Sequence, residues 1–322
     1  MPVAQKKKQA KSKARAKTTA GWKLRRAKGV AVLDAAPLAK LRWLTHGFST
    51  RIGGASEMPG HSTGKRGEKA LAKALNLGFT DWDERTCVTA NRQKFYAAVG
   101  AAKMQPVTLR QIHSDIVHRV ERANLSPSDD APQADALVTN EPGVLLIVQI
   151  ADCVPILLAD TKNRAVAAIH SGWRGTLQRI AEKTLGRMQM EFGTRPGDVI
   201  AVLGPAIGRC CYEIGSDVAK EFHAQFPNAR DWFDGPYDAL ASGENDPNWL
   251  PWLTMKPPGH APPPLTGQLD LVAANRDILA TAGVPPKNIF ASNFCTACRT
   301  DLFFSYRRER ETGRMMAAIG IR

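Results

Sequence analysis

Short apolar runs, most of them broken by a polar residue or a glycine, recur along the chain from Leu41 to its C-terminus. Alternating apolar and polar residues predict a strand that starts at Leu41 and enters a loop at Gly53 and Gly54. The most apolar run, 143–160, is long enough for two buried strands that break at 151–153. Further strands are predicted at 165–170, 198–208 and 314–321, and a pair of strands interrupted near His113 is predicted at 106–120.

Segments with helical periodicity lie between these strands. Helices are predicted at 68–78, at 86–100 and from about Thr176 onward. A further helix follows Asp270, which is a suitable N-cap, and ends at Gly283. Strands that alternate with helices predict an α/β fold with the helices outside the sheets.

Two segments lack a clear period. The polar, turn-rich segment 55–69 predicts a surface loop, and the Trp- and Pro-rich segment 229–266 predicts a long excursion from the fold. With 322 residues, of which 43% are hydrophobic and 23% charged, the chain fits an ordinary globular protein. Because no uninterrupted apolar run approaches about 18 residues, we expect no membrane span.

The net charge of +14 is concentrated at the N-terminus. Residues 1–29 contain eleven Lys or Arg and no Asp or Glu, which leaves +3 on residues 30–322 (14 − 11 = 3). This composition predicts a disordered basic tail followed by one folded domain. The tail could contact nucleic acid, but we do not expect that contact to be the main function.

The six cysteines occur without a secretory signal, which predicts a reducing compartment, the cytoplasm. Cys295 and Cys298 form a "CTAC" motif that could be half of a structural zinc site. A complete site would need two more cysteines, and only the adjacent Cys210 and Cys211 are available. We therefore expect a plain loop with free thiols.

Three residues that can bind a metal interrupt or end apolar runs: His113, Cys153 and His170. Two imidazoles and a thiolate suit Zn²⁺ and leave a coordination position open for catalysis, although the same ligands can also hold copper. Asp152 could orient a ligating histidine or transfer protons. A different chemistry would use Cys153 as a nucleophile and His170 as its base.

Several motifs together resemble one known family, in the same order along the chain. They are "HGFSTRIGG", "RQIHSD", "ADALVTNEPGVLLIVQIADCVPILLAD", "AAIHSGWRGT", "LGPAIGRCCYEIG" and "CTACRTDLFFSYRRERETGR". The family is variously named laccase-domain or polyphenol oxidase, peptidoglycan editing factor and purine nucleoside phosphorylase. The resemblance extends from about Leu41 to the C-terminus, and it implies that 30–322 is a metal-dependent catalytic domain.

The resemblance implies a single layered domain, with helices outside two packed sheets (α/β/β/α), related to the catalytic fold of cytotoxic necrotizing factors. It also implies that His113, Cys153 and His170 bind the catalytic metal. Together with the reasoning from the residues, this makes Cys153, Asp152 and His170 the expected catalytic residues. The implied activity is phosphate-dependent cleavage of adenosine, inosine and methylthioadenosine, accompanied by adenosine deamination. Purine nucleoside and inorganic phosphate are therefore the expected partners.

The residues expected to bind substrate or phosphate are Ser49, Arg51, Asn76 and Arg174. Arginine side chains are suited to hold an anion through paired hydrogen bonds. Two other enzymatic functions stay open: a hydrolase that removes wrongly incorporated amino acids from a cell-wall precursor, and a copper-dependent polyphenol oxidase. A nucleic-acid binder that acts through the basic tail is the non-enzymatic alternative.

Overall fold

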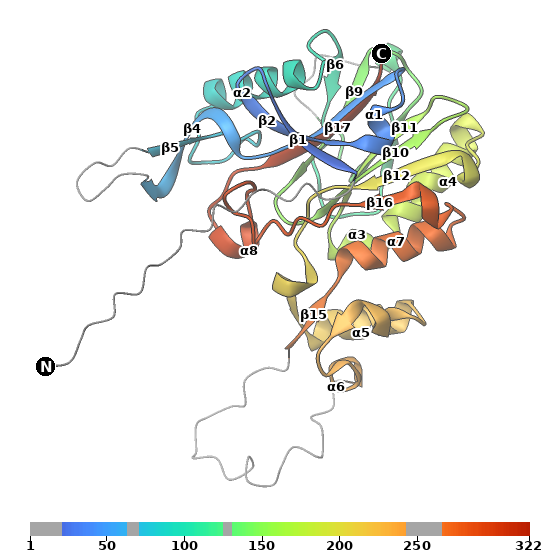
Figure 1. Ribbon diagram of the computed structural model, residues 1–322. Helices are drawn as coiled ribbons and strands as arrows, with labels where there is room; N and C mark the ends of the chain where they lie inside the picture. The colour runs from blue at the N-terminus through green and yellow to red at the C-terminus, as the bar shows by residue number, and fades with distance from the viewer. Residues whose placement is uncertain (1–20, 63–70, 125–130, 243–265) are drawn as a thin grey trace, which may run out of the picture.

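The computed structural model describes residues 21–62, 71–124, 131–242 and 266–322. Within these residues the chain builds two six-stranded sheets that pack against each other, with helices on both outer sides (Figure 1). The α/β class predicted from the alternation of strands and helices is confirmed.

The first sheet contains both ends of the described chain. Its strands are mostly antiparallel, and the C-terminal strand β17 lies between β3 and β9. In spatial order the strands are β1 (Trp22–Ala27), β2 (Val30–Ala35), β3 (Leu44–Ser49), β17 (Met315–Ile321), β9 (Val144–Ile150) and β6 (Gln105–Val107).

The second sheet contains the strands that lead into the candidate site. Strand β10 pairs with β11 on one side and β12 on the other, both antiparallel. In spatial order the strands are β16 (Ile289–Ala291), β12 (Val199–Leu203), β10 (Val154–Asp160), β11 (Val166–Ser171), β8 (Ala136–Thr139) and β7 (Val117–Arg119). The predicted break of 143–160 into two strands is confirmed, and the two strands lie in different sheets.

Three apolar layers hold the domain together. Side chains of both sheets, among them Phe48 and Leu157, form the central layer. Phe95 of α2 (Arg85–Ala98) packs on the outer face of the first sheet. The outer face of the second sheet is covered by α4 (Ile180–Phe192) and α7 (Leu271–Thr281), as Figure 1 shows. Burial on both faces explains why the central strands are almost entirely apolar.

A smaller unit precedes α7 in the chain and extends below the sheets in Figure 1. Its three-stranded sheet and its two helices form part of the same core as the second sheet. The elements are β13 (Glu213–Gly215), α5 (Ser216–Gln225), β14 (Phe233–Asp234), α6 (Tyr237–Ser242) and β15 (Thr266–Leu269). The remaining short elements are α1 (Ala36–Ala39), α3 (Trp173–Leu177), α8 (Tyr306–Glu309) and the pair β4 (Ile52–Ser62) and β5 (Leu71–Ala74).

The boundary expected for the disordered tail is wrong. Residues 22–27 form strand β1, which pairs antiparallel with β2. The Trp22 ring packs 5.3 Å from that of Phe48, and its indole N–H donates to the Ala291 carbonyl at 3.2 Å. An ion pair between Arg25 and Asp34 compensates part of the basic charge. Residues 1–20 lie outside the described residues, and the prediction of disorder there stays untested.

Two other local predictions are corrected. The segment 68–78 contains the strand β5 instead of a helix, and 55–62, expected to be loop, belongs to β4. The short apolar pattern around Leu75 fits the period of a helix as well as that of a strand. Pairing with β4 therefore decides in favour of a strand. The helix predicted from Thr176 is two helices, because the chain takes a left-handed turn with φ of 59° at Arg179.

The helix expected after Asp270 is confirmed as α7. The Asp270 carboxylate accepts a hydrogen bond from the Ala273 N–H at 2.9 Å, and Gly283 follows with φ of 98°. Within the described residues, no helix has both the length and the apolar character that crossing a membrane requires.

Candidate functional site

The candidate site lies where three segments meet at the ends of strands. Cys153 occupies the turn between β9 and β10, and His170 lies near the end of β11. The pairing of β10 with β11 places Pro155 opposite His170, so Cys153 comes close to that histidine. The link between β6 and β7 contributes His113.

The ligand atoms of His113, Cys153 and His170 all lie within 4.8 Å of one another. Cys153 Sγ is 3.9 Å from His113 Nε2, and the two imidazole centroids are 4.9 Å apart. Gly172 permits this approach, because a Cβ there would lie 3.0 Å from Cys153 Sγ. The sequence prediction that these three residues come together agrees with the described geometry.

The cluster is closed on one side and open on the other. His170 is buried, with 4% of its surface exposed, Cys153 is half-buried and His113 is exposed. Both His113, with φ of 59°, and Asp152, with φ of 89°, have backbone conformations that are uncommon for these residues. Such conformations concentrate at functional sites, where the surrounding structure maintains them.

Asp135 connects two of the three segments. Its Oδ1 lies 2.8 Å from His170 Nδ1, and its Oδ2 accepts hydrogen bonds from the N–H and hydroxyl of Ser114 at 2.6 and 2.7 Å. The fully buried carboxylate therefore orients His170 and also fixes the loop that carries His113. Burial alone would raise the pKa of Asp135, but the hydrogen bonds from His170 and Ser114 lower it to about 2.

Cys153 and His170 favour opposite charges. Burial alone would raise the pKa of the Cys153 thiol, but the charge of His170 and hydrogen bonds from both histidines lower it to about 6. Burial alone would lower the pKa of His170, but the Cys153 thiolate and Asp135 raise it to about 9. The site thus favours a thiolate at Cys153, which is the form that binds metals and acts as a nucleophile.

These residues fit a metal ion. Because the Asp135 carboxylate occupies Nδ1 of His170, Nε2 is left to act as a ligand, an arrangement common at metal sites. Two imidazole nitrogens and one thiolate are a typical donor set for catalytic zinc. His113 is exposed, so the cluster is open to solvent on that side.

Asp152 is held firmly beside the cluster. Its Oδ1 accepts the Thr296 hydroxyl and its Oδ2 accepts the Arg307 N–H, both at 2.6 Å. Its carbonyl accepts the Ile207 N–H at 2.8 Å. Three segments from the C-terminal half therefore fix the residue that precedes Cys153.

Three of the residues expected to bind substrate have partners within the protein. Arg51 forms an ion pair with Glu309 at 2.7 Å and donates to the carbonyls of Thr300 and Phe303. Ser49 accepts the N–H of Met316 at 2.9 Å. These contacts give both residues a structural role, and the expectation that Ser49 and Arg51 bind substrate or phosphate stays a prediction.

Asn76 is also part of a structural network. It is fully buried, and its side chain bonds to the backbone of Gly78 and to Asp83, while its Oδ1 accepts the Arg314 N–H at 2.9 Å. Arg174 is different: it is exposed, and its guanidinium lies 4.4 Å above the Trp173 ring. Of the four expected residues, Arg174 is the one whose charge faces solvent near the cluster.

The sequence analysis missed Asp135 and several residues of the motif "FFSYRRERETGR". Arg314 is partly buried, which lowers its pKa, and the charges of Cys153 and Asp152 oppose this effect. The pKa of Tyr212 is raised, mainly by burial and also by the charge of Cys153. The Arg307 guanidinium lies 5.1 Å from the centre of the Tyr212 ring. The motif was recognised as family-like, but its arginines could not be placed near Cys153 without the fold.

The cysteines of the "CTAC" motif are free thiols, as expected, but they belong to a cluster that was not predicted. The sulfur atoms of Cys210, Cys211, Cys295 and Cys298 all lie within 4.8 Å of one another. The two cysteine pairs come from separate loops, after β12 and after β16. The described residues therefore contain a second cluster of metal-binding side chains.

A layered α/β fold with a His–Cys–His cluster at its strand ends defines a protein whose site suits a metal ion. Residues 45–322 match the family described as multi-copper polyphenol oxidoreductase laccase. The chain belongs to this family, as the motifs implied.

Curated relatives and a solved structure agree with this membership. The chain is 35% identical over 300 residues, 92% of its length and 94% of the relative's, to a purine nucleoside phosphorylase of Deinococcus radiodurans. It is 33% identical over 282 residues, 86% of its length and 89% of the relative's, to the purine nucleoside phosphorylase YlmD of Geobacillus stearothermophilus. The crystal structure of that YlmD protein matches with a TM-score of 0.72 and 30% identity, covering 93% of this chain and 98% of that one.

Proposed function

We propose that the protein is a zinc-dependent purine nucleoside phosphorylase that acts on adenosine, inosine and methylthioadenosine. The observation that carries this proposal is the cluster of His113, Cys153 and His170, with Asp135 behind it. The names of the two relatives support the substrate class. Together they favour an enzyme in which one open metal site acts on a nucleoside and phosphate.

Zinc is proposed instead of copper because of the number of sites. Multi-copper oxygen reduction would require further histidine-rich sites next to the first. Among the described residues, the metal-binding clusters are one with two histidines and one made of cysteines alone. The first has the ligand number and types of a catalytic zinc site.

In phosphorolysis, a phosphate oxygen forms a bond to C1′ of the ribose and the bond from C1′ to the purine nitrogen breaks. The electron pair leaves with the base, which takes up a proton. A bound zinc ion would supply Lewis acidity at this point. Asp135 keeps His170 and the His113 loop in position, so the ligands need little reorganisation.

The neighbouring charges have complementary proposed roles. Arg314 interacts with the charge of Cys153, and Arg174 and Arg307 with that of the neighbouring Tyr212. Their positive charges suit the binding of inorganic phosphate. Asp152 is the proposed proton-transfer group, because it is a fixed carboxylate next to Cys153. The same carboxylate would serve adenosine deamination, in which water adds to C6 of the purine and ammonia leaves.

The proposal is tested by measuring metal content and base release from the three nucleosides, with and without phosphate. We expect zinc at the His–Cys–His site and phosphate-dependent base release, and Cys153→Ala should lose both. Cys87→Ala is the matched control, since Cys87 lies on α2 outside both clusters. Bound zinc without base release would contradict the proposal and favour the cell-wall-precursor hydrolase. Copper together with phenol oxidation would contradict it in favour of the oxidase.

A metal-free mechanism is the second candidate, because the site favours a thiolate at Cys153 beside a charged His170. In this mechanism Cys153 would act as the nucleophile and His170 as its base. His113→Ala separates the two mechanisms. The zinc mechanism predicts loss of both metal and activity, whereas a Cys153 and His170 pair would keep most of its activity and be insensitive to chelators.

A further inference from the structure

The cysteine cluster formed by Cys210, Cys211, Cys295 and Cys298 has the geometry of a four-thiolate metal site. Cys210 Sγ is 3.8 Å from that of Cys211 and 3.6 Å from that of Cys298, and the sulfurs of Cys211 and Cys298 are 3.4 Å apart. With zinc–sulfur bonds of about 2.3 Å, the edges of a regular tetrahedron would be about 3.8 Å. The sulfurs thus surround one point at approximately the spacing that zinc requires, and all four cysteines are free thiols.

Two hydrogen-bond donors from outside the cluster are directed at its sulfur atoms. The Gly208 N–H donates to Cys295 Sγ at 3.2 Å, and the Arg308 guanidinium lies 3.9 Å from Cys211 Sγ. Hydrogen bonds to the ligands and a nearby positive charge are usual outside a zinc–thiolate centre. A Zn²⁺ ion with four thiolates has a net charge of −2, which Arg308 would partly offset.

The cluster joins the two loops that hold Asp152. Thr296 lies between the two cysteines of the "CTAC" motif, and its hydroxyl donates to Asp152 Oδ1 at 2.6 Å. Its N–H donates to the Ala206 carbonyl at 2.9 Å, and the next residue, Ile207, donates its N–H to the Asp152 carbonyl. The two cysteine-bearing loops therefore meet at the residue that precedes Cys153.

The geometry points to a second metal site, in which Cys210, Cys211, Cys295 and Cys298 bind a structural Zn²⁺ ion that fixes the two loops around Asp152. Four ligands from the protein fill the tetrahedron, so this ion has no open position for a substrate. Its role is to position Asp152, and its binding does not depend on the proposed phosphorylase activity. The site is distinct from the cluster of His113, Cys153 and His170, with which it shares no ligand.

Metal analysis of the full chain tests this inference directly. We expect about two zinc ions per chain in the wild-type protein and about one in Cys295→Ser. His113→Ala should also hold about one, retained at the cysteine cluster, and Cys87→Ser should hold two. One zinc in the wild-type protein with no further loss in Cys295→Ser would overturn the proposal, as would iron in place of zinc.

A second measurement uses Co²⁺ as the probe and does not depend on nucleoside cleavage. Thiolate-to-cobalt charge transfer depends on the number of sulfur ligands, which is four at the cysteine cluster and one at the other. Apoprotein loaded with Co²⁺ should therefore keep most of this absorption in Cys153→Ala and lose most of it in Cys295→Ser. Equal loss in the two variants would contradict a four-thiolate site.

Thiol titration of the wild-type protein keeps the test valid if a cysteine variant does not fold. With Zn²⁺ bound, the four cysteines should react slowly with a thiol reagent, and chelation should release them together with one metal ion. The melting temperature should fall in the same step, because a ligand that binds the folded state stabilises it. Disulfides between these cysteines in protein purified under non-reducing conditions, with no zinc retained, would overturn the inference.

Discussion

Two buried histidines have opposite chemical environments although both lie in strands, His46 in β3 and His170 in β11. Their exposed fractions are similar, 6% for His46 and 4% for His170. Burial lowers the pKa of His46 to about 4, with Asp34 opposing the effect, so this histidine is neutral at pH 7. At His170, burial is outweighed by the Cys153 thiolate and Asp135, which raise the pKa to about 9.

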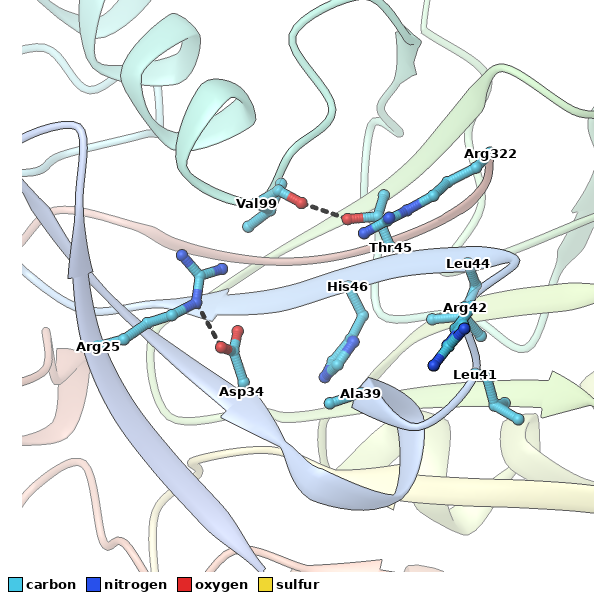
Figure 2. A pocket seen from close by; sticks show the side chains of 10 residues that line it. All are labelled: Arg25, Asp34, Ala39, Leu41, Arg42, Leu44, Thr45, His46, Val99 and Arg322. Atoms are coloured by element: carbon cyan, nitrogen blue, oxygen red, sulfur yellow. Dashed lines mark hydrogen bonds and ion pairs between the residues drawn. The ribbon is translucent and has the colours of Figure 1, made fainter.

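The Cys153 thiolate beside His170, together with the different partners of the two neighbouring carboxylates, explains the difference. His46 lies in a hollow of about 330 Å³ at the edge of the first sheet (Figure 2). Asp34 lines the same hollow but forms an ion pair with Arg25, and His46 Nε2 accepts the Ala35 N–H at 3.0 Å. Asp135 instead bonds directly to His170. A buried histidine thus becomes a candidate for chemistry when a carboxylate is directed at it.

The largest expected effect comes from removing each histidine in turn. His170→Ala should release the metal and lower phosphate-dependent base release by about 10³-fold or more, since a ligand is lost and the Lewis acidity of the metal with it. His46→Ala should keep the metal and the rate constant of the folded enzyme while lowering its melting temperature. Steady-state kinetics and metal analysis of both purified variants decide this. Equal activity losses in the two would break the comparison.

The second prediction uses the low pKa of His46. The folded state resists protonation until about pH 4, whereas the unfolded chain takes up a proton near 6.5, so stability falls as pH drops from 6.5 towards 4. At 1.36 kcal/mol per pH unit, His46 accounts for a loss of about 3 kcal/mol over this range. His46→Gln, whose amide oxygen can accept the Ala35 N–H, should remove this part of the loss.

Urea unfolding of the wild-type protein and of His46→Gln at pH 7 and pH 4.5 measures the effect. The contributions of other titratable groups cancel when the pH-dependent change in unfolding free energy is compared between the two proteins. The free energies of unfolding should change less with pH in the variant. If both proteins lose stability equally, then His46 is protonated in the folded state and the contrast with His170 disappears.

Sequence reasoning reached the three metal-binding residues because each interrupts or ends an apolar run. It does not show why His46 and His170 differ, because each lies within or at the end of a predicted strand and is followed by a small residue, Gly47 or Ser171. Asp135 lies 35 residues from His170, and its role depends on the pairing of β8 with β11. Only the fold brings that carboxylate to the imidazole.

Long-range contacts also explain what the sequence could not show. The partner of Arg51, Glu309, is 258 residues away in the chain, so their ion pair could not be predicted. The two cysteine pairs come from loops after different strands, so the "CTAC" motif alone could not identify them as one cluster. Pattern analysis succeeded for long periodic elements such as α2 and α7, where the signal is local.

The third prediction concerns Asp135, the carboxylate that bonds directly to His170. Asp135→Asn keeps the shape of the side chain but removes its charge, which should lower metal affinity or activity by about 10- to 100-fold. Metal competition titrations and kinetics measure this. Asp34→Asn is the matched control near His46 and should leave activity unchanged. A normal metal affinity in Asp135→Asn would show that orientation without charge is enough for His170.

The smallest expected effect comes from Ser114, which supports Asp135 from the His113 loop. Ser114→Ala removes a hydroxyl that donates to Asp135 Oδ2 at 2.7 Å but leaves the Ser114 N–H bond to the same oxygen. One hydrogen bond to a charged group contributes about 1.5–3 kcal/mol, but the remaining donor compensates partly, so we expect a loss of about threefold in kcat/KM. Thr89→Ala, which removes an exposed hydroxyl on α2, is the control. If Ser114→Ala lost as much kcat/KM as Asp135→Asn, then the position of the His113 loop would matter more than the charge on Asp135. The contrast between His170 and His46 would then not rest on that charge.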